Sequence, residues 1–446
     1  MTPKPERPDR PDRRTSVRRP DALAVRVDRE LVRTTYHSSR YVVAELVAPP
    51  VPPTTDGRQR PADTLAFVLD RSGSMAGRKI ELAREAVRQA IERLGARDRF
   101  SLVVYDDHID VVMPTTLATP EARREALDRL GRIDARGSTD LGSGWLRGAE
   151  QVAERLDREG VNRVLLLTDG LANVGMTDPD ELIHHAAQLR ERGIATSTFG
   201  LGNDFNEALL QGMASAGGGS FRYIERAEQI PDHLAGEVGE ALEVTARDVA
   251  LEVTTPDGLR VDTLTPRPLE THGNRTLVRL GDLVSDQLVR VILRIGFPMG
   301  EPGREIGALI AVTDRDGAFG AEPATVTWRY ADNPTNDRQP RDREVDRVVA
   351  RAYADRALSD VVALNRQGRY DEARRLLLGV ARRIREYAGH DAVLVGIVEE
   401  LEREADHWSV MQSELSRKAM YAQRSYSMNL REASGAAMRR PPSPRS

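Results

Sequence analysis

Short apolar runs alternate with amphipathic segments between residues 62 and 243, and this alternation constrains the fold more than any other feature of the chain. Each run closes on a polar loop, and the first is followed by apolar residues at helical spacing from Ile80 to Leu94. Strands that alternate with helices predict a doubly wound α/β domain with a mostly parallel sheet. Only 4% of the residues are aromatic, so the core must be aliphatic, which suits strands buried on both faces. The predicted strands are 64–70, 100–106, 163–170, 195–202 and 221–225.

One further strand is predicted in the same domain. Residues 109–113 follow the second strand with almost no gap. A tight connection joins antiparallel strands, whereas a parallel pair needs a long crossover. We therefore expect 109–113 to lie antiparallel at an edge of the sheet.

The regions on either side of the α/β domain have a β pattern. In residues 287–295, apolar side chains alternate with arginines, which is typical of a strand with one face on a core. Before the domain, 23–27 and 41–47 also resemble strands, and two strands alone cannot make a core. We therefore expect residues 21–60 to join 244–335 in one β-sandwich, so that the α/β domain at 62–243 is inserted in the sandwich or lies next to it.

The last third of the chain is predicted to be helical. Residues 341–430 carry the apolar spacing of helices, and the join at 364–373 resembles the turn inside a tetratricopeptide repeat. Stacked repeats need about three copies, and the sequence offers no clear second copy, so a plain helical hairpin is the prediction. The charged, proline-containing ends, 1–20 and 431–446, are predicted to be solvated, disordered tails.

The composition excludes several classes of function. The chain has no cysteine, which excludes disulfides, thiolate zinc sites and a cysteine nucleophile, and fits the cytoplasm. Its formal net charge of -4 gives no reason to expect attraction to nucleic acid or to anionic lipid. No stretch reaches the roughly 18 apolar residues of a membrane span. We expect a cytoplasmic protein without a nucleic-acid or membrane partner.

Oxygen-bearing side chains gather at the predicted strand ends. The first strand ends in Asp70, Ser72 and Ser74, which lie two residues apart and point the same way if the loop stays extended. Ligands of open α/β sheets bind beyond the carboxyl ends of the strands, where Asp169 ends a later strand. If these strands are neighbours, both carboxylates can reach one ion, and Thr139 can add a hydroxyl. The sequence therefore predicts a cation site at this edge.

The chemistry of the donors indicates the cation and its use. All are hard oxygen donors, which suit Mg²⁺, Mn²⁺ or Ca²⁺, and we expect Mg²⁺. Two carboxylates leave the bound cation with net positive character and an open position, which favours an acidic residue of a partner protein. We assign Arg71 and Asp140 to the partner contact, and Asp140 is also expected to cap a helix. We expect an exposed polar rim, so that Asp70→Ala removes the metal without unfolding the protein.

The residues at this edge carry a resemblance to a known family. They are Asp70-Arg-Ser-Gly-Ser74, Thr139 and Thr168-Asp169-Gly170. Their order and context resemble the metal-ion-dependent adhesion site of von Willebrand factor type A (VWA) domains, over residues 62–240. The regions on either side are similar to those of bacterial cytosolic members of that family. The resemblance implies strand order 3-2-1-4-5-6, metal contacts from the two serines and Thr139, and water-mediated roles for the two aspartates.

The resemblance also implies a function. It implies a protein-binding or scaffolding protein that is not an enzyme, working beside an ATPase or a stress-response assembly. One alternative is a Mg²⁺-dependent phosphoryl-transfer hydrolase of the haloacid dehalogenase type with Asp70 as nucleophile. The motif of that family is Asp-x-Asp, whereas residue 72 of this chain is serine. Another alternative is a scaffold whose sandwich and helices bind the partner. Asp106 and Asp107, after the second strand, are predicted to form a solvated turn.

Overall fold

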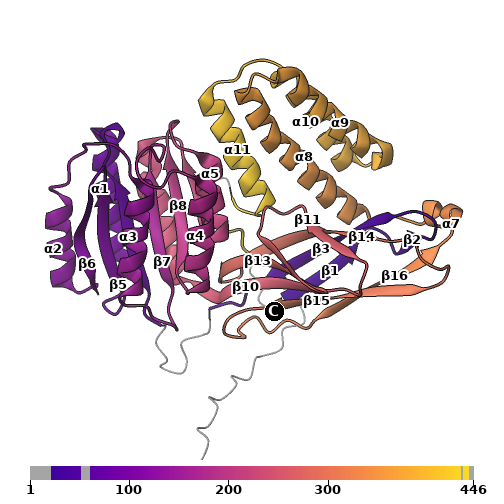
Figure 1. Ribbon diagram of the computed structural model, residues 1–446, viewed down its shortest axis with the longest axis horizontal. Helices are drawn as coiled ribbons and strands as arrows, with labels where there is room; N and C mark the ends of the chain where they lie inside the picture. Colours follow the sequence, from indigo (N-terminus) through magenta and orange to yellow (C-terminus); the bar gives the residue numbers. More distant parts are fainter. Residues whose placement is uncertain (1–21, 52–60, 433–434, 441–446) are drawn as a thin grey trace, which may run out of the picture.

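The computed structural model describes residues 22–51, 61–432 and 435–440 of the chain. An α/β part lies at one end of the molecule, a β-sandwich lies beside it, and a bundle of helices packs over both (Figure 1). The predicted tail at 1–20 lies outside the described residues. No helix among the described residues combines the length and the apolar character that a membrane crossing requires.

The α/β sheet has the predicted strand order. Its order is β6-β5-β4-β7-β8-β9, which is 3-2-1-4-5-6 when the strands are numbered within the domain. The edge strand β6 runs antiparallel to β5, as the short connection predicts. The strands are β4 (Thr64–Asp70), β5 (Arg99–Tyr105), β6 (Ile109–Leu117), β7 (Asn162–Thr168), β8 (Ala195–Leu201) and β9 (Gly218–Ile224).

Helices cover both faces of this sheet because its strands are apolar on both sides. Every residue of β4 is buried, with Leu65 and Phe67 in one core and Ala66 and Val68 in the other. The first core is closed by α1 (Arg78–Arg93), α2 (Pro120–Leu130) and α6 (Ile230–Leu242). The second is closed by α3 (Leu141–Ala153), α4 (Pro179–Glu191) and α5 (Glu207–Ala216). Two short 3-10 helices are η3 (Gly73–Met75) and η4 (Ala227–Gln229).

The sandwich contains strands from both sides of the α/β part. One sheet has the order β1-β3-β14-β11 and the other β12-β13-β10-β15-β16-β2. Strand β3 pairs along its whole length with β14, from Val47 opposite Leu288 to Ser38 opposite Phe297. The strands are β1 (Leu23–Val27), β2 (Leu31–Arg33), β3 (Ser38–Val47), β10 (Val244–Thr254), β11 (Arg260–Thr263), β12 (Leu269–His272), β13 (Arg275–Val284), β14 (Leu288–Phe297), β15 (Glu305–Thr313) and β16 (Ala324–Ala331).

The helical region is larger than the predicted hairpin. Three long helices supply the buried core of this region, and Met420 and Tyr421 of a fourth pack against it, so a pattern of one hairpin was an incomplete prediction. The fourth helix also buries Ala422 and Tyr426 against the α/β part, a long-range contact that periodicity does not reveal. The helices are α7 (Asn333–Arg338), α8 (Arg343–Arg366), α9 (Tyr370–Ala388), α10 (Ala392–His407) and α11 (Glu414–Met428).

The bundle is attached to both other parts. Val345 and Val349 of α8 pack on Val43 and Ile292 of the sandwich. Lys418 of α11 donates to Glu207 of the α/β part at 2.9 Å. These contacts hold the three parts together at buried surfaces.

The prediction of a disordered tail over 431–446 is wrong for its described part. Arg439 forms a β-bridge with Gln287, and the backbone nitrogen of Leu288 donates to Met438 O at 2.9 Å. Ala437 is buried, and its nitrogen donates to Glu240 at 2.9 Å. The segment is ordered because its backbone donors and acceptors find partners on two folded parts, which composition alone does not indicate.

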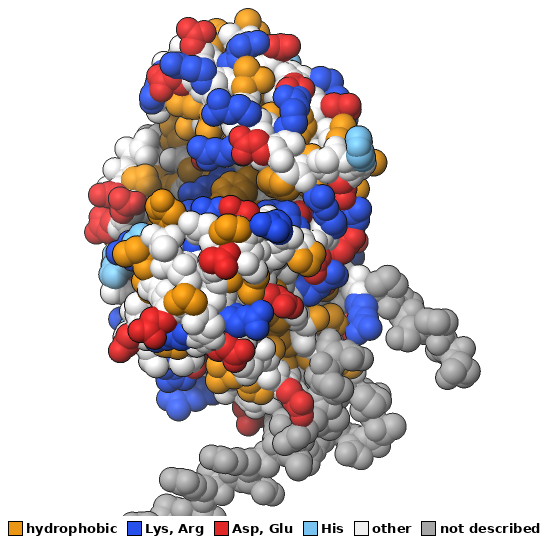
Figure 2. Space-filling view, turned by 90° about the vertical axis from the view of Figure 1, so that its right-hand side faces the viewer, with side chains coloured by type: hydrophobic (Ala, Val, Ile, Leu, Met, Phe, Trp, Pro, Cys, Tyr) orange, Lys and Arg blue, Asp and Glu red, His pale blue; other side chains and the backbone are white. Residues whose placement is uncertain are grey.

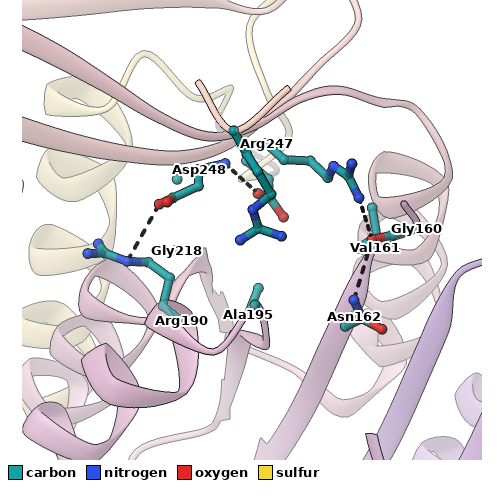
Figure 3. Close-up of a pocket in the computed structure, with 12 residues that line it drawn as sticks. Gly160, Val161, Asn162, Arg190, Ala195, Gly218, Arg247 and Asp248 are labelled. Atoms are coloured by element: carbon teal, nitrogen blue, oxygen red, sulfur yellow. Dashed lines mark hydrogen bonds and ion pairs between the residues drawn. The ribbon is translucent and has the colours of Figure 1, made fainter. Parts of the chain in front are cut away.

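Arginines cross the junction between the α/β part and the sandwich (Figure 3). Arg247 Nη1 donates to Gly160 O at 2.9 Å, and Arg190 Nε lies 3.8 Å from Asp248 Oδ1. This junction lies at the amino ends of the parallel strands, so it leaves their carboxyl ends free. On the face shown in Figure 2, acidic and basic side chains are interspersed over the described residues.

Candidate functional site

The carboxyl ends of β4 and β7 bring the predicted oxygen donors together. These strands are parallel neighbours, with Leu69 opposite Leu167. Ser74 Oγ donates to Asp169 Oδ1 at 2.7 Å and lies 3.0 Å from Ser72 Oγ. Ser74 is exposed whereas Ser72 is buried. The cluster therefore opens to solvent on the side of Ser74.

Asp70 lies beneath this cluster and is completely buried. The Ser72 backbone nitrogen donates to its Oδ1 at 2.8 Å, and Thr168 Oγ1 donates to its Oδ2 at 2.7 Å. Burial raises the pKa of the Asp70 carboxyl to about 6, because it outweighs these hydrogen bonds. The expectation of an exposed rim is therefore wrong for Asp70 and for Asp169, which is equally buried. Strand ends are buried here because loops of the domain cover them.

Thr139 reaches the cluster from the loop before α3. A Cβ added to Gly170 would lie 3.6 Å from Thr139 Oγ1 and 3.8 Å from Ser74 Oγ, so both hydroxyls face this glycine. Asn173 holds the loop by accepting from the Thr139 nitrogen at 2.9 Å. The Gly73 nitrogen donates to Gly137 O at 3.1 Å. These contacts fix the loop against the end of β4.

The two residues assigned to partner contact have internal contacts. Arg71 is 7% exposed, and its guanidinium bonds Asp106 at 3.1 Å and Asp110 at 2.6 Å. It therefore joins the loops after β4 and β5 and is not displayed on the surface. Asp140 caps α3, as predicted, by accepting from the Ser143 nitrogen at 3.1 Å.

Asp106, Asp107 and His108 form a second group of potential metal ligands, the one triad of acidic and histidine side chains within reach of a common point among the described residues. Asp106 already accepts from Arg71 and from Arg136, the latter at 2.7 Å. Burial alone would raise its pKa, but Arg136 and the backbone of His108 outweigh burial and lower it. These internal cations satisfy its charge, so the group is less suited to a metal ion.

Sequence reasoning missed Lys79, the second residue of α1. Its Nζ lies 2.5 Å from Asp169 Oδ2, on the side of that carboxylate that Ser74 leaves free. Gly77, with φ of 73°, turns the chain into α1 so that the first helical turn faces the cluster. The sequence did offer one signal for Lys79: a cation in the first turn of a helix interacts unfavourably with the helix dipole, so its presence there suggests another role.

The donor set fits a divalent cation. Asp70 has no basic partner among the described residues, and Asp169 has one, Lys79. Two buried carboxylates with one ammonium carry an uncompensated negative charge, which is costly unless a cation is added. The hydroxyls of Ser72, Ser74 and Thr139 offer further hard oxygens. The arrangement can hold Mg²⁺, Mn²⁺ or Ca²⁺.

Apolar side chains border the cluster. Leu171 and Val174 are 54% and 37% exposed, and both lie in the loop that follows Asp169. The nitrogen of Val174 donates to Thr139 O at 3.3 Å, so the loop is fixed beside a predicted ligand. These two side chains give one border of the cluster an exposed apolar character.

Comparisons with known sequences locate a domain over the α/β part. The model of the von Willebrand factor type A domain matches residues 64–234. YfbK of Escherichia coli (strain K12) is 31% identical over 195 residues, 43% of this chain and 34% of YfbK. Inter-alpha-trypsin inhibitor heavy chain H4 of Sus scrofa is 32% identical over 208 residues, 44% of this chain and 22% of that protein. The match therefore spans about a third of YfbK and less than a quarter of the inhibitor heavy chain.

Comparisons with solved structures extend over nearly the whole chain. A von Willebrand factor type A protein from Catenulispora acidiphila has a TM-score of 0.66 at 18% identity, covering 91% of this chain and 90% of that one. The ArnB paralog VWA2 from Sulfolobus acidocaldarius has a TM-score of 0.57 at 16% identity, covering 92% and 98%. At these identities the likeness shows the fold. The chain therefore contains a von Willebrand factor type A domain at residues 64–234, joined to further sheets and a helical region.

Proposed function

We propose that this chain binds a partner protein through a divalent cation held at the carboxyl ends of β4 and β7. The observation that carries the proposal is that oxygen donors gather at this edge around buried carboxylates whose negative charge is not fully balanced. Ser74 Oγ lies within hydrogen-bonding distance of both Ser72 Oγ and Asp169 Oδ1, while Asp70 is buried with no basic partner in the described part of the chain. VWA domains are mostly adhesion or scaffold modules, which supports binding without catalysis.

The proposed roles of the site residues follow from their positions in the cluster. Ser72, Ser74 and Thr139 are proposed as direct ligands, and Asp70 and Asp169 as acceptors beneath them that fix the hydroxyls and supply negative charge. The cation supplies a Lewis-acidic position for a carboxylate of the partner. Mg²⁺ is proposed because these are hard oxygen donors and only a few come from the protein, which suits an ion that keeps several waters.

The partner is proposed to present an acidic residue beside apolar ones. Leu171 and Val174 supply the matching apolar surface next to the cluster. Buried apolar contact provides affinity, whereas the carboxylate provides dependence on the metal. The predicted ATPase or stress-response partner has no support in the comparisons and is not part of the proposal.

The other units are proposed to organise this site without forming it. We propose that residues 62–243 are the binding domain, that 21–60 and 244–335 form the sandwich, and that 341–430 form the helical unit. A cytoplasmic location is proposed from the lack of cysteine. Because residue 72 is serine, no observation favours phosphoryl transfer from Asp70.

Affinity capture from lysate of the native cells tests the proposal. Wild type and Asp169→Asn are compared side by side, each with Mg²⁺ and with EDTA; asparagine is used because Asp169 is buried. The proposal predicts a partner that is retained by wild type with Mg²⁺ and lost in the other three conditions. A partner retained in all four conditions would move the binding function to the sandwich or to the helices.

A further inference from the structure

Lys79 occupies a position that helix energetics disfavours. It is in the first turn of α1, where the free amides make the helix end electropositive and acidic side chains are preferred. Its side chain is 32% exposed, whereas Asp169 beside it is fully buried. The lysine therefore does not extend into solvent but turns toward the candidate cation site.

The contact divides the Asp169 carboxylate between two neighbours. Ser74 Oγ donates to Oδ1 at 2.7 Å, and Lys79 Nζ lies 2.5 Å from Oδ2. Arg78, the preceding residue, points elsewhere and pairs loosely with Glu81 at 3.7 Å, with 67% of its side chain exposed. Of these two adjacent cations, only Lys79 contacts the cluster.

The lysine changes the charge of the site. Asp70 and Asp169 together carry two negative charges when both are ionised, and Lys79 reduces this to one. A divalent cation then leaves a net charge of plus one, whereas without the lysine it would leave the site neutral. Charges within a few ångströms in a partly buried site interact strongly. A fixed ammonium must therefore repel the metal ion and attract an incoming anion.

We infer that Lys79 is a specificity-determining residue that weakens cation binding and strengthens the binding of the partner's acidic group. This inference rests on the proposed function. It adds a residue that sets the affinity of the site for the metal ion relative to its affinity for the partner's carboxylate. It predicts a site that binds its cation loosely alone and holds the cation better with an acidic group in place. Binding of either one then favours binding of the other.

A competing explanation is that Lys79 forms a structural salt bridge. In that case its removal would loosen the loops, so that affinity for the metal would fall or stay unchanged. The charge explanation predicts the opposite direction, a rise in metal affinity. The sign of the change therefore separates the two explanations.

The test uses the full chain and Mn²⁺ as the probe. Mn²⁺ affinity is measured by isothermal titration calorimetry for wild type, Lys79→Met, Lys79→Gln, Lys79→Arg, Arg78→Met and Asp169→Asn. Acetate is then titrated into each Mn²⁺-loaded protein, and its binding is followed by water proton relaxation. Thermal unfolding in EDTA identifies any variant that does not fold, and the two neutral variants serve as checks on each other.

The inference predicts at least tenfold tighter Mn²⁺ binding for Lys79→Met and Lys79→Gln, with acetate affinity at least threefold weaker. Lys79→Arg should resemble wild type because it keeps the charge, and Arg78→Met should be unchanged. Equal or weaker Mn²⁺ binding by folded neutral variants would overturn the inference. Failure of the proposed function looks different, because Asp169→Asn would then bind Mn²⁺ as wild type does, or wild type would bind none.

Discussion

Two groups of buried carboxylates in the α/β domain differ in how their charge is balanced. Glu237 of α6 accepts from Arg163 and Arg222, both at 2.9 Å, and from Ser197 at 2.6 Å. Burial alone would raise its pKa, but the two arginines outweigh burial and hold the pKa well below its usual range. No cation among the residues that the structure describes pairs with Asp70, and burial raises its pKa to about 6.

The difference separates a buried carboxylate that the protein's own arginines neutralise, Glu237, from one that they do not, Asp70. The Glu237 group also joins the α/β part to the sandwich, because Arg163 reaches Asp282 of the sandwich at 3.1 Å. Within the α/β part, Arg222 also pairs with Glu240 of α6 at 2.9 Å. A buried carboxylate that is fully paired serves the fold. A buried carboxylate that is left without a cation, beside exposed hydroxyls, is a place for a cation from outside.

The largest effect is expected at Glu237. Glu237→Gln removes the buried carboxylate that Arg163 and Arg222 share, so the free energy of unfolding should fall by roughly 3–5 kcal/mol. Urea unfolding measures the change. Glu243→Gln is the control, since Glu243 pairs with Arg439 at the surface and should change stability by less than about 1 kcal/mol. A loss at Glu237 no larger than the control would remove one side of the comparison.

The free energy of unfolding should also depend on pH through Glu237. The folded-state pKa of Glu237 lies below the ordinary 4.5, so the unfolded chain takes up this proton first as pH falls. Its contribution to stability is therefore present above pH 4.5 and lost as pH falls through the lower, folded-state pKa. Urea unfolding at a series of pH values should show a steeper acid loss for wild type than for Glu237→Gln. Parallel curves would contradict this assignment.

Asp70 should affect metal binding strongly and stability little. Asp70→Asn keeps the volume and removes a charge that burial disfavours, so stability in EDTA should change by no more than about 1.5 kcal/mol. Affinity for Mg²⁺ should be lost. Calorimetric titration and thermal unfolding in EDTA measure the two quantities. The asparagine variant replaces the alanine that an exposed rim would have permitted, since Asp70 is buried. Unchanged Mg²⁺ affinity would exclude Asp70 from the site.

The smallest effect is expected at Asp110, whose side chain is 54% exposed in its ion pair with Arg71. Asp110→Asn should lower the free energy of unfolding by less than about 1 kcal/mol, because solvent screens the pair. Asp106→Asn, at the buried end of the same arginine, should cost more. Chemical unfolding of both variants ranks them, and the reverse order would show that burial does not set the strength of these pairs.

Periodicity and strand-end chemistry predicted much of this molecule. The antiparallel edge strand and the gathering of Ser72, Ser74 and Asp169 at strand ends follow from local patterns. The order of the α/β strands was implied by the family resemblance and not by spacing. The short strands β2, β11 and β12 span only three or four residues each, too few for alternation to be visible.

Contacts between distant segments could not be predicted. Arg163 and Glu237 lie 74 residues apart, and the buried role of Arg71 depends on Asp106 and Asp110 in another loop. Lys79 required a glycine turn to bring it to Asp169. Such pairs are specified by tertiary packing, which one sequence does not reveal.

The most direct test of the account is an anomalous difference map from crystals grown with Mn²⁺. The proposed site predicts one strong peak at the carboxyl ends of β4 and β7, within roughly 2.0–2.6 Å of ligand hydroxyl oxygens. Crystals of Asp169→Asn should show no peak there. A peak at Asp106, Asp107 and His108 instead, or no peak at either place, would contradict the claim that the under-neutralised carboxylates mark the cation site.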